Sequence, residues 1–168
     1  KSRLHAGTSL FCYGTFTFSE NRGAYNINEA EIKEIFFELR NDLERMTAAQ
    51  YFCEVLLKTV PDGNSAPEYL RLMLNSLFLL CKGTKPTLLI KSVFELRTVC
   101  FAGYMPSLVA CESCGAFETD RMYFDCQSGA LYCKSCGGDK NLPDVSASVT
   151  AAMRYIVFSE FEKIFSFE

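Results

Sequence analysis

The sequence predicts a mainly α fold: an antiparallel helical bundle with an inserted cysteine-rich ribbon and a short β segment at its N-terminus. Three observations lead to this prediction. Apolar residues recur at helical spacing between about residues 29 and 102. Two Cys-x-x-Cys-Gly turns follow, at 111–115 and 133–137. Polar and apolar residues alternate at 15–18, which is the period of a strand.

The β segment is predicted from two short alternating runs. Thr15 to Phe18 alternate, and Tyr25 and Ile27 resume the same period after the polar turn at 19–23. This pattern indicates a hairpin. Because two or three strands are not stable alone in water, we expect residues 1–27 to be the end of a β domain.

The bundle is predicted from caps, breaks and apolar spacing. Asn28 and Glu31 form a capping-box pair that predicts a first helix over about 29–39. Three more helices are expected at about 43–60 after the cap Asp42, 67–82 before Gly83, and 86–102 before Gly103. Their short loops imply antiparallel neighbours. The residues expected to face the core are Ile32, Ile35, Phe36, Leu39, Leu43, Met46, Ala49, Cys53, Leu56, Leu70, Met73, Leu74, Leu77, Phe78, Cys81, Leu89, Val93, Phe94, Leu96 and Cys100.

Four cysteines stand in two pairs, with eighteen residues between Cys114 and Cys133. The four are Cys111, Cys114, Cys133 and Cys136, and this spacing is typical of a four-thiolate zinc site. The glycine after each pair is expected to supply the unusual φ of a tight turn. Apolar residues on both sides of 127–129 predict a hairpin that returns the second pair to the first. The sequence therefore predicts a zinc ribbon with one structural Zn²⁺, because a closed Cys₄ set leaves no open coordination position.

Two other interpretations of these cysteines stay open: a pair of disulfides, and a redox Cys-x-x-Cys. Cys126 is a fifth thiol nearby, expected to be free because it has no partner two residues away, although it could substitute as a ligand. The odd total of nine cysteines, with four in metal spacing, indicates a reducing compartment, so a cytosolic protein is expected.

Beyond the ribbon, Ser146 is expected to cap a last helix. Its apolar residues Val149, Met153, Ile156 and Val157 continue the helical stripe, so we expect this helix to pack back on the bundle.

Composition limits the function. A net charge of −3 argues against a protein that coats nucleic acid through a generally basic surface. Residues 71–97 are locally basic, with five basic residues against one acidic residue, so an anionic partner is expected there unless these are ordinary solvated helix faces. No apolar run reaches membrane length, and no signal peptide is visible. A chain that begins with Lys1 is expected to be part of a longer protein.

Catalysis is not expected. The sole histidine is His5, so triads with histidine and histidine-metal sites have no candidates elsewhere in the chain. There is also no glycine-rich phosphate-binding loop.

Several of these features together resemble one family. They are Phe94-Glu95-Leu96-Arg97, Gly103-Tyr104-x-Pro106, the two cysteine pairs with Gly115, Phe124 and Gly129 around them, and Val145-Ser146. The combination resembles the bacterial recombination mediator and DNA repair family RecO. The N-terminal residues Lys1 to Leu4, Phe16, Phe18, Gly23, Tyr25, Ala30 and Glu31 look like the end of that family's OB-fold and the entry to its helical domain.

The resemblance implies four parts: the last strands of a truncated OB-fold at 1–27, a helical domain at 28–104, the zinc ribbon at 105–142, and a C-terminal helix at 143–168. It also implies a non-enzymatic accessory of DNA repair and recombination, which helps to load recombinase on single-stranded DNA and anneals strands. The implied partners are DNA, RecR and the single-stranded-DNA-binding protein. DNA binding is expected to be weak here, because much of the OB-fold is missing. The implied location is the bacterial cytoplasm, at the nucleoid during repair.

Two alternatives from other classes remain: a zinc-ribbon interaction module of another pathway, such as transcription, and a thiol oxidoreductase.

The resemblance also predicts a partner site. The tail of the single-stranded-DNA-binding protein is acidic and ends in an apolar residue with a free carboxylate, so it needs an apolar pocket and a cation. We expect Arg71, Lys91 and Arg97 to supply the cations, beside Leu70, Leu74, Phe78 and Phe94. The alternative is that Arg97 pairs with Glu38 or Glu44 inside the bundle and serves only stability.

Overall fold

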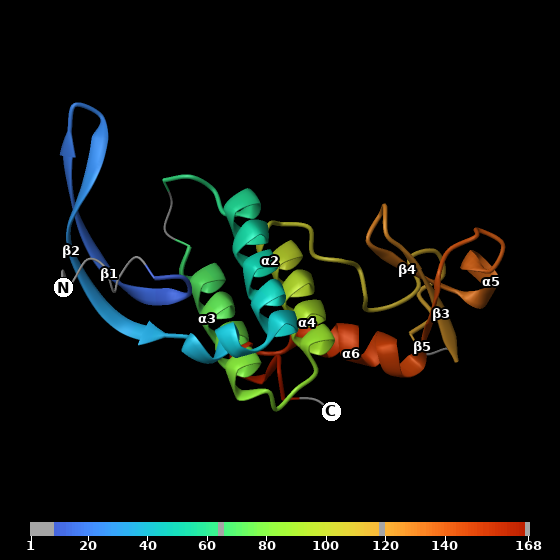
Figure 1. The fold of residues 1–168 in the computed structure, drawn as a ribbon. Helices are drawn as coiled ribbons and strands as arrows, with labels where there is room; N and C mark the ends of the chain where they lie inside the picture. The colour runs from blue at the N-terminus through green and yellow to red at the C-terminus, as the bar shows by residue number, and fades with distance from the viewer. Residues whose placement is uncertain (1–8, 64–65, 118–119, 167–168) are drawn as a thin grey trace.

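A computed structural model describes residues 9–63, 66–117 and 120–166 of the chain (Figure 1). A long hairpin lies at one end of an elongated molecule, helices fill the middle, and the cysteine-rich ribbon lies at the other end. The family-like residues Lys1 to Leu4 and the histidine His5 lie outside the described residues. The predicted mainly helical class is confirmed, and the structure adds small antiparallel sheets to the helices.

The hairpin at the N-terminal end is confirmed. Strand β1 (Cys12–Asn21) pairs antiparallel with β2 (Ala24–Ile35), and Gly23 with φ of 79° supports the turn between them. The register shifts twice, so that Asn28 and Lys33 of β2 have no directly opposite residue on β1 in the strand pairing. Each of these residues is a β-bulge.

The predicted helix at 29–39 is wrong. Residues 29–35 continue β2, and only a short 3₁₀ helix, η1 (Phe37–Asn41), follows. The bulges explain the error, because each inserts one residue and changes a spacing of two into a spacing of three. The side chains opposite Phe18, Phe16, Gly14 and Cys12 are therefore Ile27, Ala30, Ile32 and Ile35, a spacing that resembles a helix although all share one face of the hairpin.

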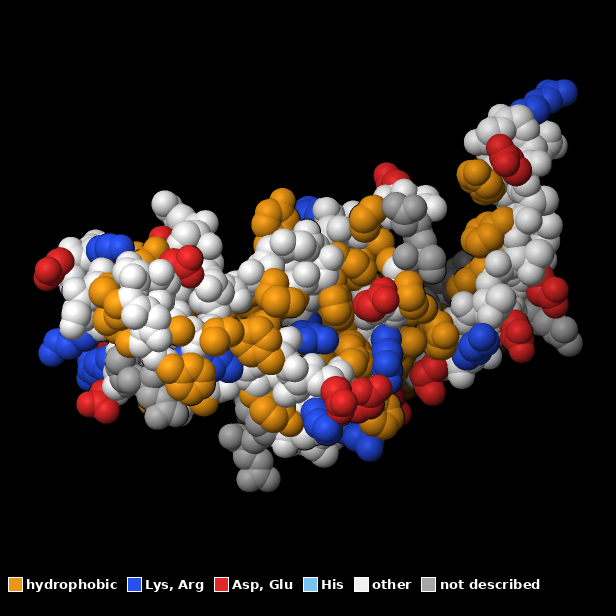
Figure 2. All heavy atoms as spheres, turned by 180° about the vertical axis from the view of Figure 1, so that it is seen from behind, with side chains coloured by type: hydrophobic (Ala, Val, Ile, Leu, Met, Phe, Trp, Pro, Cys, Tyr) orange, Lys and Arg blue, Asp and Glu red, His pale blue; other side chains and the backbone are white. Residues whose placement is uncertain are grey.

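This apolar face of the hairpin is largely open to solvent. Phe18 is 54% exposed, Tyr25 72% and Ile27 38%. Figure 2 shows hydrophobic side chains along the edge of the hairpin that is turned toward the rest of the molecule. A gap separates this edge from the rest of the molecule. The hairpin therefore makes few contacts with the helices beyond its base, where Phe11 and Phe36 are buried.

The middle of the molecule contains three helices: α2 (Leu43–Thr59), α3 (Pro67–Lys82) and α4 (Thr87–Phe101). Their predicted boundaries are confirmed. The Asp42 side chain accepts a hydrogen bond from the N–H of Arg45 at the start of α2, and Gly83 ends α3 with φ of 62°. All three helices pack against one another, and η1 packs against α2 and α3.

The core of the bundle centres on Phe52 and Phe94, which are fully buried and stack with their ring centroids 4.1 Å apart. Leu39 of η1 is fully buried beside them, as its apolar spacing predicted, although its element differs. Four residues predicted to face the core are instead exposed, namely Ile35 at 37%, Leu43 at 75%, Leu70 at 46% and Phe78 at 51%, and so is Val149 of the predicted stripe on the last helix, at 47%.

The ribbon contains three short strands in the order β4–β3–β5: β3 (Arg121–Asp125), β4 (Ala130–Cys133) and β5 (Asp144–Ser146). The predicted hairpin over 122–132 is confirmed, whereas β5 was not predicted. A one-turn helix, α5 (Lys134–Gly137), carries the end of the second cysteine pair. The ribbon has its own core, which includes Leu108, Met122 and Leu131.

Helix α6 (Ala147–Phe158) lies between the two cores. Ser146 caps it as predicted, by accepting a hydrogen bond from the N–H of Val149. Ile156 lies in the bundle core, and the next residue, Val157, lies in the ribbon core. A final 3₁₀ turn, η2 (Phe161–Lys163), leads to Ile164, which is buried in the bundle. Within the described ranges, no helix has the length and hydropathy required to cross a bilayer.

The stacked pair gives the first prediction. Changing Phe94 to Ala should lower the free energy of unfolding by about 3–5 kcal/mol, because it removes a ring from a filled core. Urea denaturation measures the change. Leu57→Ala is the matched control on α2, since Leu57 is 85% exposed, and its effect should stay within about 0.5 kcal/mol. Equal effects of the two variants would contradict the assigned core.

Candidate functional site

The first cysteine pair lies on a tight turn. The N–H of Gly115 donates to the carbonyl of Cys111 at 2.8 Å, and the N–H of Cys111 donates to the carbonyl of Ala116 at 2.8 Å. Gly115 has a φ of 73°, the left-handed conformation predicted for this position. Cys111 is buried and Cys114 is exposed. This turn presents both sulfurs to the same side.

The second cysteine pair is positioned by a strand end and a short helix rather than by a turn. Cys133 ends β4 and is the N-cap of α5, and Cys136 lies within that helix. Gly137 does not have a positive φ, so the predicted reason for this glycine is wrong. A Cβ at Gly137 would lie 2.7 Å from the Cβ of Tyr132 and 3.2 Å from that of Tyr123. Glycine is required here because α5 packs directly on the β3–β4 hairpin.

The four sulfurs converge. Those of Cys111, Cys114, Cys133 and Cys136 all lie within 4.8 Å of one another, and those of Cys114 and Cys133 are 3.6 Å apart. Tetrahedral zinc with Zn–S bonds of about 2.3 Å separates its sulfurs by about 3.8 Å. The donor set therefore has the chemistry and approximate dimensions of a four-thiolate metal site.

The electrostatics of the cluster also favour a cation. Burial raises the pKa of the Cys111 thiol, but hydrogen bonds from the backbone at Cys133, Cys114 and Ser113 outweigh it and lower the pKa to about 6. Hydrogen bonds to the sulfurs of Cys133 and Cys114 raise the pKa of Cys136 to about 12. A thiolate at Cys111 thus makes ionisation of the neighbouring thiols less favourable. A bound dication would offset the repulsion between the thiolates.

The remaining cysteines do not join this cluster. Cys126 lies in the turn after β3, exposed and outside the group of four. All nine cysteines are free thiols in the structure.

Helix α6 holds the ribbon through Arg154, which sequence analysis missed. The guanidinium of Arg154 donates to the carbonyls of Leu108 at 2.6 Å, Val109 at 2.9 Å and Phe117 at 3.0 Å. It also lies over the ring of Phe117, 4.5 Å from its centroid. These carbonyls flank the first cysteine pair on both sides, so Arg154 fixes the segment that carries Cys111 and Cys114.

Each of the three predicted partner-binding cations has a partner within the chain. Arg71 of α3 is exposed, forms an ion pair with Glu162 at 2.6 Å and lies over the ring of Phe161. Arg97 donates to the carbonyls of Ile156 and Val157 at 3.2 and 2.9 Å, in the last turn of α6. Arg97 thereby donates hydrogen bonds to carbonyls at the end of α6 that have no partner within the helix.

Lys91 lies elsewhere on α4. It is six residues before Arg97, which places the two side chains about 120° apart around the helix. The ammonium group of Lys91 forms an ion pair with Glu95 at 2.8 Å and lies 5.2 Å from the ring centroid of Tyr51, whose hydroxyl donates to the same carboxylate. The hydrogen bond to Glu95 raises the pKa of Lys91, so this side chain is a cation at neutral pH.

Beside Lys91 is an apolar groove, which we call the α2–α4 groove. Its volume is about 740 Å³, and its walls include Leu43, Ala48 and Tyr51 of α2 and Leu88 of α4. Leu43 and Leu88 are 75% and 71% exposed, so the groove offers apolar contacts to a ligand. The N-cap of α4 is Pro86, which provides no side-chain cap for the N–H groups of the first turn.

Comparisons with known proteins identify the family of this chain. A model of the family described as recombination protein O, C terminal, matches residues 40–168, which include the bundle, the ribbon and α6. The chain is 36% identical over its whole length to the DNA repair protein RecO of Acetivibrio thermocellus. The chain belongs to the RecO family.

Two further RecO proteins extend the comparison. The DNA repair protein RecO of Alkaliphilus metalliredigens is 30% identical over 98% of the chain, and that of Desulforamulus reducens is 34% identical over 80%. The chain spans 67% of the length of the Acetivibrio and Alkaliphilus relatives and 52% of the Desulforamulus relative.

Arg154 gives the second prediction. Arg154→Lys keeps the charge but removes the planar fork that reaches three carbonyls, so the segment around Cys111 should exchange its amide hydrogens about tenfold faster. Hydrogen exchange read by mass spectrometry measures this. Arg121→Lys is the control within the ribbon, since its ion pair with Asp144 is solvent-exposed. Unchanged exchange in Arg154→Lys would mean that the three hydrogen bonds contribute little.

Proposed function

We propose that this chain is a non-enzymatic accessory of DNA repair and recombination. In this proposal it helps to load recombinase on single-stranded DNA and to anneal strands, through contacts with DNA, RecR and the single-stranded-DNA-binding protein. The observation that carries the proposal is membership of the RecO family over residues 40–168, with relatives named as DNA repair proteins. A four-cysteine set supports a structural rather than a catalytic metal, because such a set leaves no coordination position for a substrate.

The metal in this proposal is one zinc ion, held by Cys111, Cys114, Cys133 and Cys136. Its role is to stabilise the ribbon, whose apolar core is small. Bacterial cytoplasm is the compartment that fits free thiols and a thiolate metal site. In the proposed role, DNA binding by this chain is weak, because its net charge is −3 and the two strands of the hairpin offer little of an OB-fold surface.

Zinc gives the third prediction. Cys133→Ser should reduce zinc from about one ion per chain to near zero and remove the exchange protection of the ribbon amides, since metal binding at such sites supplies about 10–16 kcal/mol in peptide models. Metal analysis and hydrogen exchange measure the two effects, and the bundle should stay folded.

Cys126→Ser is the matched control, because Cys126 is a ribbon thiol outside the cluster. Zinc content unaffected by Cys133→Ser would contradict the proposed site. Freely titrating thiols with no bound metal in the native protein would instead favour the oxidoreductase alternative.

The tail of the single-stranded-DNA-binding protein is the ligand that we propose for the α2–α4 groove. Lys91 supplies the cation at the groove, and Leu43, Tyr51 and Leu88 supply apolar contacts for the terminal side chain. The positive end of the α4 dipole favours a carboxylate at the same place. Arg71 and Arg97, the other two predicted cations, are engaged with Glu162 and with the end of α6.

The groove gives the fourth prediction, which also tests the function. The chain should be retained on single-stranded DNA coated with the binding protein, and not when that protein lacks its acidic tail. Lys91→Ala should weaken binding of a fluorescent tail peptide about fivefold or more, because it removes the cation that faces the carboxylate. Fluorescence anisotropy measures the affinity.

Arg71→Ala and Arg97→Ala are the comparison variants for this test. If either weakens the peptide and Lys91→Ala does not, the tail binds at that arginine rather than in the α2–α4 groove. If the chain is not retained in a tail-dependent way at all, the proposed loading role is wrong.

A further inference from the structure

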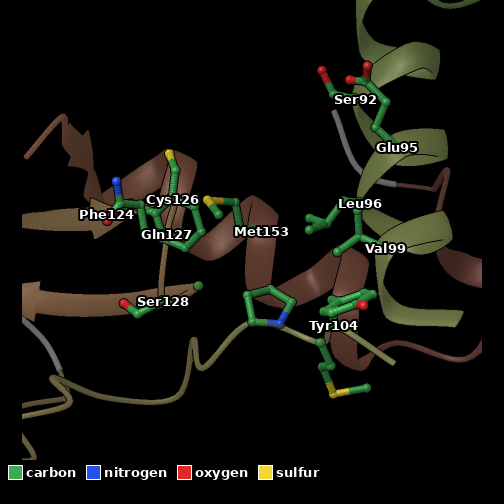
Figure 3. Close-up of a pocket in the computed structure, with 13 residues that line it drawn as sticks. Ser92, Glu95, Leu96, Val99, Tyr104, Phe124, Cys126, Gln127, Ser128 and Met153 are labelled. Carbon is green, nitrogen blue, oxygen red and sulfur yellow. The ribbon is translucent and has the colours of Figure 1, made fainter. Parts of the chain in front are cut away.

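A second cavity separates the helical bundle from the ribbon, and we call it the ribbon cleft. Its volume is about 640 Å³. Figure 3 shows Leu96 and Val99 of α4 on one side, Phe124 and Cys126 of the ribbon on the other, and Tyr104 and Met153 below and between them. Three separate parts of the chain thus build its walls.

The walls of this cleft are mainly apolar and accessible. Val99 is 43% exposed, Tyr104 78% and Met105 57%. A volume of this size lies within the range of about 300–1,000 Å³ that is typical of ligand sites. Two of the lining residues, Met105 and Met153, have flexible side chains that adapt to different apolar surfaces. The cleft therefore suits a short apolar segment of another protein.

The charge of the cleft selects among such segments. Among the described residues that line it, Glu95 alone is charged at neutral pH. Lys91 and Tyr51 both contact the Oε1 atom of Glu95, which leaves the Oε2 atom without a partner in the described part of the chain. A phosphate or a carboxylate would be repelled here, so neither DNA nor an acidic tail is complementary to this cleft.

We propose that the ribbon cleft binds a segment of a partner protein that carries apolar side chains and a lysine or arginine, with Glu95 as its anionic anchor. The apolar side chains pack against Leu96, Val99 and Phe124. The cation of the segment pairs with Glu95 at the end of the cleft, where Figure 3 shows the carboxylate beside Ser92.

The same carboxylate links the ribbon cleft to the α2–α4 groove. Lys91 lines the groove and Glu95 lines the cleft, and Nζ of Lys91 lies 2.8 Å from Oε1 of Glu95. A carboxylate that binds Lys91 competes with Glu95 and leaves Glu95 more available to a cation in the cleft. Ligands of the two cavities should therefore favour each other's binding. This coupling rests on the proposed tail site, whereas the cleft itself does not.

The test uses the full chain and two probes. One is a short fluorescent peptide of leucine and lysine with both ends blocked, and the other is the same peptide with glutamate in place of lysine. The lysine peptide should bind, and it should protect Cys126 from alkylation, read at that residue by mass spectrometry. Glu95→Gln should weaken the lysine peptide about three- to fivefold, the range of a partly exposed ion pair.

Lys91→Ala should act in the opposite direction, because it frees Glu95. It should strengthen the lysine peptide about twofold while it weakens the tail peptide. Val99→Lys is a second variant: it places a cation on the wall of the cleft one turn after Glu95 on α4, where it repels the lysine of the peptide and can itself pair with Glu95, so it too should weaken the lysine peptide.

Three results would overturn the cleft proposal: equal binding of the two probes, no protection of Cys126, or a lysine-peptide affinity unchanged in both Glu95→Gln and Val99→Lys. A lysine peptide that responds as expected while the tail peptide ignores Lys91→Ala would leave the cleft standing and refute the tail site. The reverse pattern would refute the cleft alone.

Discussion

Arginine contacts to main-chain carbonyls determine how the ribbon sits on the bundle. Arg97 of α4 holds the last turn of α6, and Arg154 of α6 holds both sides of the first cysteine pair. The side chains of Ile156 and Val157, whose carbonyls Arg97 contacts, lie in the bundle core and the ribbon core respectively. Helix α6 is thus bound to the bundle and to the ribbon through residues of its C-terminal half. Because α6 contacts α4 as well as β3 and β5 of the ribbon, it connects the two walls of the ribbon cleft.

The candidate metal site could be predicted from sequence because its signal is local. Two cysteine pairs and a turn specify most of its geometry, and the four sulfurs do converge. The role of Gly137 could not be predicted in the same way, since it depends on how closely α5 approaches Tyr132. The role of Arg154 could not be predicted for a different reason. Its hydrogen-bond partners are backbone carbonyls, which every residue has, so no pattern of side chains in the sequence indicates them.

The sequence predicted secondary structure and burial less well where contacts between distant parts of the chain determine them. The segment 29–35 follows a helical cap signal, and two bulges give its apolar residues a helix-like spacing, but pairing with β1 makes it a strand. The helices of the bundle were predicted well because caps and breaks delimit them. Which face of each helix is buried was predicted less well, as Leu43 and Leu70 show. Likewise, basic residues counted along a segment need not share a surface, and Lys91 and Arg97 do not.

The two bulges of the hairpin also affect how copies of this chain behave toward one another. Among the described residues this sheet has two strands, so each strand has one edge without a partner strand, and such an edge beside an exposed apolar face can pair with a further strand. Bulges interrupt the regular row of N–H and C=O groups and strengthen the local twist, so a flat partner strand does not fit. Glu29, Glu31 and Glu34 on the other face of β2 add like-charge repulsion between copies. The irregularity that makes this strand resemble a helix in the sequence therefore also disfavours edge-to-edge pairing between copies of the described hairpin.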